Sequence, residues 1–269
     1  LEADQRGLAR TVWRSMPVAG GMPTVEFRLP PSAFRQVWGP DGKSLTFLNR
    51  TDPARNVYRL GAAGSPGSAT GEPVQVTRFA NGRLTSQVWS PDGTRLAVTL
   101  TRDGGSQIYL ISADGGQSTR ITTSSGIDTE PYFSPDGASI YFTSDRGGSP
   151  QIYRMPSAGG AATRVTFGSS YNVSPRVSPD GKQIAYITRR DGRFFVAIKE
   201  LASGNETLLT DTGQEESPSF SPNGRWIMYS TQGRAGDTLV IVTTDGRFRQ
   251  PLPKASGDIR EPAWGPYPK

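Results

Sequence analysis

A serine-proline-aspartate-glycine element recurs along this chain at nearly constant spacing. Proline presets φ, and glycine accepts the positive φ of a tight hairpin, so each copy predicts a turn between two short strands. Repeats of about 40 to 45 residues built from short strands are typical of β-propeller blades. The repeat prolines are Pro40, Pro91, Pro135, Pro179, Pro222 and Pro266, with steps of 51, 44, 44, 43 and 44 residues.

The residues around each turn repeat a pattern of four short strands. In the third copy we expect strands at residues 130–134, 139–144, 151–155 and 163–167, each rich in β-branched or aromatic side chains or bounded by glycine turns. No segment has a sustained helical period. The sequence therefore predicts an all-β fold, a six-bladed β-propeller with four-stranded antiparallel blades in one domain, residues 1–269. Blades one to five are expected at residues 31–79, 83–123, 127–167, 171–210 and 214–253.

The sixth blade is expected to be closed by both termini, from residues 260–269 together with 1–30. Closure of this kind protects the edges of both end strands. Only Leu1 and Glu2 precede the segment that aligns with a second-to-third strand turn, which is too little for a second strand. We therefore expect an incomplete sixth blade, with three strands or with an exposed edge that recruits another chain.

Composition argues against catalysis. The chain has neither histidine nor cysteine, so the usual general base, the thiol nucleophile, the commonest metal ligands and any disulfide are missing. The acidic residues are scattered among the turns. We expect no enzyme activity and no organic cofactor.

Charge and hydropathy limit the partners. The formal net charge is +6, and residues 1–88 hold eleven basic against six acidic residues. These arginines are spread along the segment without a cluster, so we expect no nucleic-acid binding. No apolar run approaches the ~20 residues of a spanning helix, and the first residues lack the pattern of a signal peptide. We expect no membrane insertion and no signal peptide in this chain.

Several motifs resemble one family. Residues 126–136, which contain Thr129-Glu130-Pro131-Tyr132-Phe133, and residues 244–267 near the carboxyl end resemble the carboxy-terminal propeller of the TolB family of the Tol-Pal system. The resemblance covers about residues 90–269. Residues 1–88 resemble TolB-type repeats of other proteins, called WD40-like or PD40 repeats. A composite chain joined near residues 89–93 is one interpretation, and drift within one family is the other.

The resemblance implies a function. It implies a non-enzymatic, periplasmic, protein-binding propeller that presents its channel face to the lipoprotein Pal or to colicin segments, in support of outer-membrane integrity and cell division. Binding to TolA is not expected, because the amino-terminal segment that engages it is not in this chain. The alternative is a composite or engineered propeller scaffold with no retained partner binding.

The candidate site is the mouth of the central channel. The residue five before each repeat proline precedes an inner strand, where six strands would converge. Glu130 and Glu261 would lie on opposite blades, able to accept partner N–H groups, pair with a lysine, or hold calcium in the channel. The other interpretation is that these groups cap strands and hydrate the channel. The candidate partner-binding residues are Arg35, Ser86, Asp128, Thr129, Glu130, Ser174, Glu216, Ser217, Arg260 and Glu261.

Two other repeated residue types have a structural interpretation. The turn aspartates, such as Asp136, do not follow the order of sialidase aspartate boxes, and turn geometry explains them. Trp38, Trp89 and Trp264 share one repeat position. We expect them in the core between blades.

Overall fold

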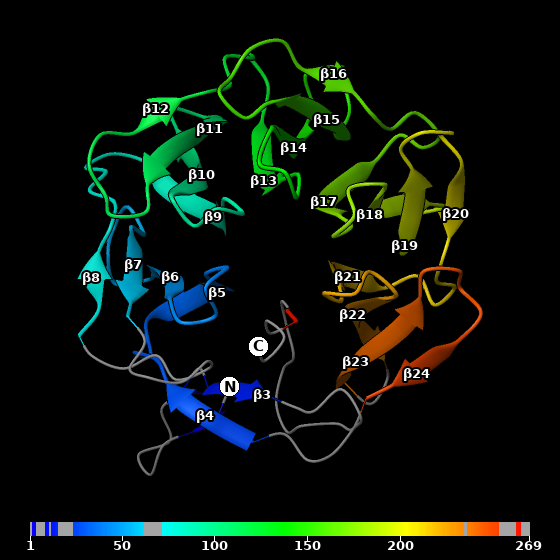
Figure 1. Ribbon diagram of the computed structural model, residues 1–269, viewed down its shortest axis with the longest axis horizontal. Coiled ribbons are helices and arrows are strands. Elements are labelled where there is room, and N and C mark those ends of the chain that lie inside the picture. The colour runs from blue at the N-terminus through cyan, green and yellow to red at the C-terminus, as the bar shows by residue number, and fades with distance from the viewer. Residues whose placement is uncertain are drawn as a thin grey trace.

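A computed structural model describes residues 2–3, 9–10, 12–15, 24–61, 72–233, 236–252 and 262–264, with side chains from Leu29 onward. Antiparallel sheets radiate from a common axis, as in a propeller (Figure 1). Within these ranges, no helix is long and apolar enough to cross a bilayer.

Five four-stranded blades make up most of the ring. In each blade the strands follow sequence order from the axis outward, so the first strand lines the centre (Figure 1). The blades are β5 (Ala33–Trp38), β6 (Leu45–Asn49), β7 (Val57–Leu60) and β8 (Val74–Gln75); β9 (Arg83–Trp89), β10 (Arg95–Arg102), β11 (Gly105–Ser112) and β12 (Thr119–Arg120); β13 (Asp128–Phe133), β14 (Ser139–Ser144), β15 (Gln151–Pro156) and β16 (Thr163–Arg164); β17 (Asn172–Val177), β18 (Gln183–Arg190), β19 (Arg193–Glu200) and β20 (Glu206–Leu208); and β21 (Glu215–Phe220), β22 (Trp226–Gly233), β23 (Gly236–Thr243) and β24 (Arg249–Pro251).

The prediction of six blades was wrong. Besides the five blades, the described residues contain two two-stranded sheets, β1 (Glu2–Ala3) with β2 (Ala9–Arg10) and β3 (Val12–Ser15) with β4 (Thr24–Arg28). The pair β3–β4 lies between the first and fifth blades in Figure 1.

The expected sixth inner strand is also missing from the part of it that the structure describes. Residues 262–264 have no strand structure. The other residues expected in that strand, Arg260 and Glu261, lie outside the described residues, as do residues 265–269 of the expected sixth blade. The repeat therefore predicted the hairpin turns of the five blades correctly, but not the number of blades.

The repeat turns share one hydrogen-bond pattern. Ser134 Oγ donates to Asp136 Oδ1 at 2.5 Å and accepts from the Ser139 N–H at 2.9 Å, while the Gly137 N–H donates to the Ser134 carbonyl at 2.8 Å. Asn223 forms the same turn in the fifth blade, with Ser221 Oγ donating to its Oδ1 at 2.7 Å. The structural interpretation of the turn aspartates is therefore confirmed.

These turns predict a contribution to acid sensitivity. The Ser134 hydroxyl, followed by the Ala138 N–H, holds the pKa of Asp136 below its usual value. The same kind of contact with Ser90 lowers the pKa of Asp92 to about 2, and a contact with Ser178 lowers that of Asp180. A carboxyl with a lowered pKa in the folded state stabilises the fold above its unfolded pKa, and this stabilisation disappears as pH falls through the folded value.

We therefore expect the triple variant Asp92→Asn, Asp136→Asn and Asp180→Asn to unfold with a shallower pH dependence than the wild type. Thermal unfolding measured from about pH 7 to about pH 2 checks this. At neutral pH the variant should keep its fold, because Asn223 already supports such a turn. Parallel pH profiles for the two proteins would contradict the assignment.

The apolar core lies between blades. Phe133, Ile140 and Phe142 of the third blade pack with Leu110 and Ile121 of the second. Each sheet thus buries a face against its neighbour, as a propeller requires.

The repeated tryptophan joins that core. Trp89 is 8% exposed, and its Nε1–H donates to Thr46 Oγ1 of the preceding blade at 3.1 Å. Trp264 donates to the Ser219 carbonyl at 2.9 Å. The expectation of a tryptophan in the core between blades is confirmed for Trp89, whereas Trp264 is half-buried.

Candidate functional site at the channel mouth

Most of the inner strands depart from regular strand geometry at the same repeat position, which lies at the channel mouth. Four of the candidate residues, Arg35, Glu130, Ser174 and Ser217, have positive φ of 51°, 54°, 57° and 54°. At each of them the pairing with the second strand shifts register, as in a β-bulge. Left-handed backbone costs a non-glycine residue about 1 to 2 kcal/mol. Strain of this kind collects at functional sites.

The residue after each bulge explains a sequence difference between the blades. Pro131, Pro175 and Pro218 are buried and follow the bulge residue. Proline brings no N–H, so none is left unpaired where the ladder is interrupted. The first two blades have Gln36 and Gln87 there. Gln87 Nε2 donates to the Arg35 carbonyl at 2.8 Å and so links these two blades.

Glu130 holds two blades together. Its Oε2 accepts from Thr143 Oγ1 at 2.9 Å and from the Ser174 N–H at 2.9 Å, and its Oε1 accepts from Ser174 Oγ at 2.8 Å. Ser174 is the same repeat position in the next blade. The carboxylate is therefore occupied by donors of its own chain and links the third blade to the fourth at the mouth.

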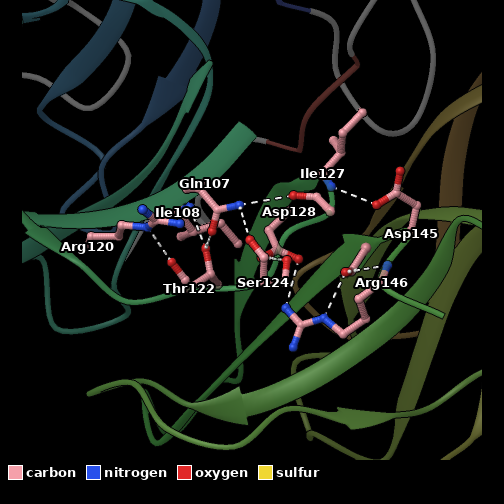
Figure 2. A network of polar contacts seen from close by, with 11 residues as sticks. Gln107, Ile108, Arg120, Thr122, Ser124, Ile127, Asp128, Asp145 and Arg146 are labelled. Carbon is pink, nitrogen blue, oxygen red and sulfur yellow. Dashed lines mark hydrogen bonds and ion pairs between the residues drawn. The ribbon is translucent and has the colours of Figure 1, made fainter. Parts of the chain in front are cut away.

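Asp128, two residues earlier, is the centre of a buried network (Figure 2). It is 0% exposed; Arg146 Nη2 donates to its Oδ1 at 2.7 Å and Ser124 Oγ to its Oδ2 at 2.7 Å. Gln107 Nε2 donates to the carbonyl of Ser124 at 3.1 Å, and Thr122 Oγ1 donates to Gln107 Oε1 at 2.9 Å. The network ties the outer edge of the second blade to the start of the third.

At the same repeat position in the next two blades, other buried side chains make the anchoring hydrogen bonds. Asn172 Nδ2 donates to Gln151 Oε1 at 2.8 Å. Glu215 is 0% exposed and accepts from the Gly213 N–H at 3.0 Å and from Thr212 Oγ1. Asp128 and its counterparts in the next two blades are thus buried anchors at the starts of the inner strands that form the mouth.

An open pocket of about 260 Å³ lies at the mouth. Tyr171 forms part of its wall, and burial, followed by the charge of Glu130, raises the pKa of this tyrosine. Asp145 accepts the Ile127 N–H at 2.6 Å (Figure 2). Ile127 is 45% exposed, which is unusual for isoleucine. The lining residues are Arg35, Thr85, Ser86, Ile127, Thr129, Glu130, Thr143, Asp145, Pro150, Tyr171 and Val173.

Four candidate residues, Arg35, Ser86, Thr129 and Glu130, line this one pocket. The others do not. Asp128 is buried beneath it, Glu216 is exposed, and Ser174 and Ser217 are half-buried on neighbouring inner strands. Arg260 and Glu261 lie outside the described residues.

The other residues of the pocket wall were not predicted from the sequence, although some of them could have been. Thr143 is the cross-strand partner of Thr129, so pairing of the first two strands would have placed it there. Tyr171 and Asp145 come from loops that join strands, where the repeat pattern does not predict which way a side chain points.

Calcium in the channel stays a prediction. In the described part of the chain, no three Asp or Glu side chains gather into a set that could hold a metal ion. Calcium takes about six to eight oxygen ligands, and one of the two proposed carboxylates, Glu261, is outside the described residues.

Comparison with protein families matches residues 37–268 to the model described as PD40, TolB beta propeller domain. Among curated proteins, the Tol-Pal system protein TolB of Bordetella pertussis is 47% identical over 251 residues, which are 92% of this chain and 55% of that protein. The corresponding protein of Azoarcus is 50% identical over 79 residues, 29% of this chain and 18% of that protein. The chain thus spans about half the length of the Bordetella relative.

Solved structures give the same result. TolB from Acinetobacter baumannii has a TM-score of 0.82 and 36% identity, covering 94% of this chain and 62% of that one. A putative TolB from Agrobacterium tumefaciens has a TM-score of 0.73 and 25% identity, covering 86% and 84%. Alignment of single relatives along nearly the whole chain favours drift within one family over a composite origin.

Proposed function

Because the chain belongs to the TolB beta-propeller domain family, we propose that it is the protein-binding propeller of a periplasmic Tol-Pal system protein. Its partner docks at the channel mouth. The proposed partner is a Pal-like lipoprotein or a colicin segment that uses the same surface. The proposed role is non-enzymatic support of outer-membrane integrity.

The observation that carries this proposal is the combination of a fixed rim with an exposed apolar side chain. Glu130 makes three hydrogen bonds, two of them to Ser174 of the next blade, so this part of the rim is held in place without a partner. Preorganisation of this kind lowers the entropic cost of association. Ile127 stands at this rim with 45% of its surface exposed. Apolar groups surrounded by polar ones are a common anchor for protein partners.

One truncation tests this interface. Ile127→Ala should weaken the binding of purified Pal about tenfold, because a buried anchor at the centre of an interface contributes about 1 to 2 kcal/mol. Isothermal titration calorimetry measures the dissociation constant.

The matched control is Val74→Ala. Val74 is 59% exposed on β8, the outermost strand of its blade, and does not line the pocket. Its loss should leave the affinity unchanged. Equal effects of the two variants would place the interface elsewhere, and absence of binding by the wild type would favour the scaffold without a retained partner.

A further inference from the structure

One cation near the axis has no counter-ion among the residues that the structure describes. Arg176 lies on β17, an inner strand, between the buried residues Pro175 and Val177, and is itself half-buried. Its guanidinium carbon lies 5.3 Å from the ring centroid of Tyr132, which belongs to β13 of the neighbouring blade. Its one hydrogen bond within the described ranges runs from Nη1 to the carbonyl of Pro175, at 2.9 Å.

The groups around Arg176 do not neutralise it. The ion pairs found in the described part of the chain involve other arginines and lysines. Burial raises the pKa of Tyr132, so this phenol is neutral at physiological pH. The carboxylate of Glu130, on the same strand as Tyr132, already accepts three hydrogen bonds.

A guanidinium in this state is suited to bind an anion. It carries five N–H donors in a fixed plane, and one of its nitrogens is engaged by the chain. Stacking on an aromatic ring fixes the orientation of that plane, and a planar guanidinium held in this way can pair with a carboxylate along its edge. Within a ring of low-dielectric walls, such a charge is screened less than it is on an open surface.

The distance of Arg176 from the rim of the channel limits which anions can reach it. Arg176 is two residues along the strand from the rim residue Ser174, which corresponds to at most about 7 Å. An aspartate or glutamate side chain that enters from a segment docked at the mouth spans much of this distance.

We infer that the axis at the level of Arg176 and Tyr132 is a carboxylate site, which receives one acidic side chain of the partner that docks at the channel mouth. The role of the partner rests on the proposed function, whereas the carboxylate site itself can be tested without any partner. The channel face would thereby favour a partner that presents an acidic side chain.

The first experiment observes the arginine directly in the full chain. The Arg176 Nε–H resonance, assigned by its loss in Arg176→Gln, is followed by NMR during titration with N-acetylglutamate and, separately, with N-acetylglutamine. A saturable shift with the glutamate compound alone is expected. The control is Arg189, which lies 5.2 Å from the ring of Tyr171 but is exposed; its resonance should not saturate. Equal responses to the two compounds, or equal responses of the two arginines, would overturn the site.

The second experiment uses purified Pal. If the wild type binds, Arg176→Gln should weaken binding about tenfold or more, as expected when one partner of an enclosed charge pair is removed. Arg154→Gln should not, because Arg154 is exposed over the ring of Tyr141 and does not line the pocket. Unchanged affinity in Arg176→Gln would remove this residue from the interface. If the wild type does not bind Pal, the proposed function fails, while the NMR titration still decides whether the carboxylate site exists.

Discussion

Arg146→Met should lower the free energy of unfolding by about 3 to 5 kcal/mol, the range for a buried ion pair that loses one partner. The change leaves the fully buried Asp128 carboxylate with Ser124 Oγ as its remaining donor. The opposite change, Asp128→Asn, should cost clearly less. The remaining guanidinium is 25% exposed, stacks over Phe142 at 5.1 Å, and keeps its bond to Ser144 Oγ.

The structure contains a precedent for the smaller effect. Asn172 occupies the position of Asp128 in the next blade and is buried with hydrogen-bond partners. Guanidinium chloride unfolding of the two single variants and of the double variant measures the asymmetry. The double variant should be more stable than Arg146→Met alone, because it no longer buries an unpaired charge. Equal losses in the two single variants would show that the buried charge of Asp128 contributes little to the loss of stability.

Phe142→Ala should cost about 3 to 5 kcal/mol, the usual range for removing a phenylalanine from a packed core. Phe142 is 0% exposed and stacks on Tyr153 with ring centroids 6.2 Å apart. It lies in the cluster that joins the second and third blades, so its loss weakens an interface between sheets as well as one sheet.

Chemical denaturation provides the measurement, and Phe167→Ala is the matched control. Phe167 is 66% exposed in the same blade, and its truncation should change stability by about 0.5 kcal/mol or less. Because the Arg146 guanidinium lies over Phe142, the two costly substitutions should not be additive. A small effect of Phe142→Ala would mean that the neighbouring blades close the cavity.

The repeat predicted local structure well because turn chemistry is local. The third blade's second strand, expected at residues 139–144, is β14 with those bounds. The turn hydrogen bonds of Ser134 and Asp136 follow from a motif of four residues. The number of blades could not be predicted from local sequence. It depended on whether the chain ends pair with each other, and residues 262–264 do not form the expected strand.

The candidate site was predicted in outline for a similar reason. Counting back from the repeat proline found Arg35 and Glu130 because equivalent positions in a ring face the same opening. The partners of Glu130 could not be read from the pattern. Whether its carboxylate faces a ligand or Ser174 depends on the distance between neighbouring blades, which is a property of the assembled ring. The repeat pattern did not single out Arg176, because other inner strands have uncharged residues at the same repeat position, such as Val88 and Ser219.

The left-handed residue of the inner strands has an evolutionary consequence. Arginine, glutamate and two serines adopt nearly the same φ at this point, between 51° and 57°. The main chain there is therefore imposed by the surrounding sheet and not by the side chain it carries. Sequence drift can therefore change the side chain at this point from blade to blade, while the bulge that displays it is kept.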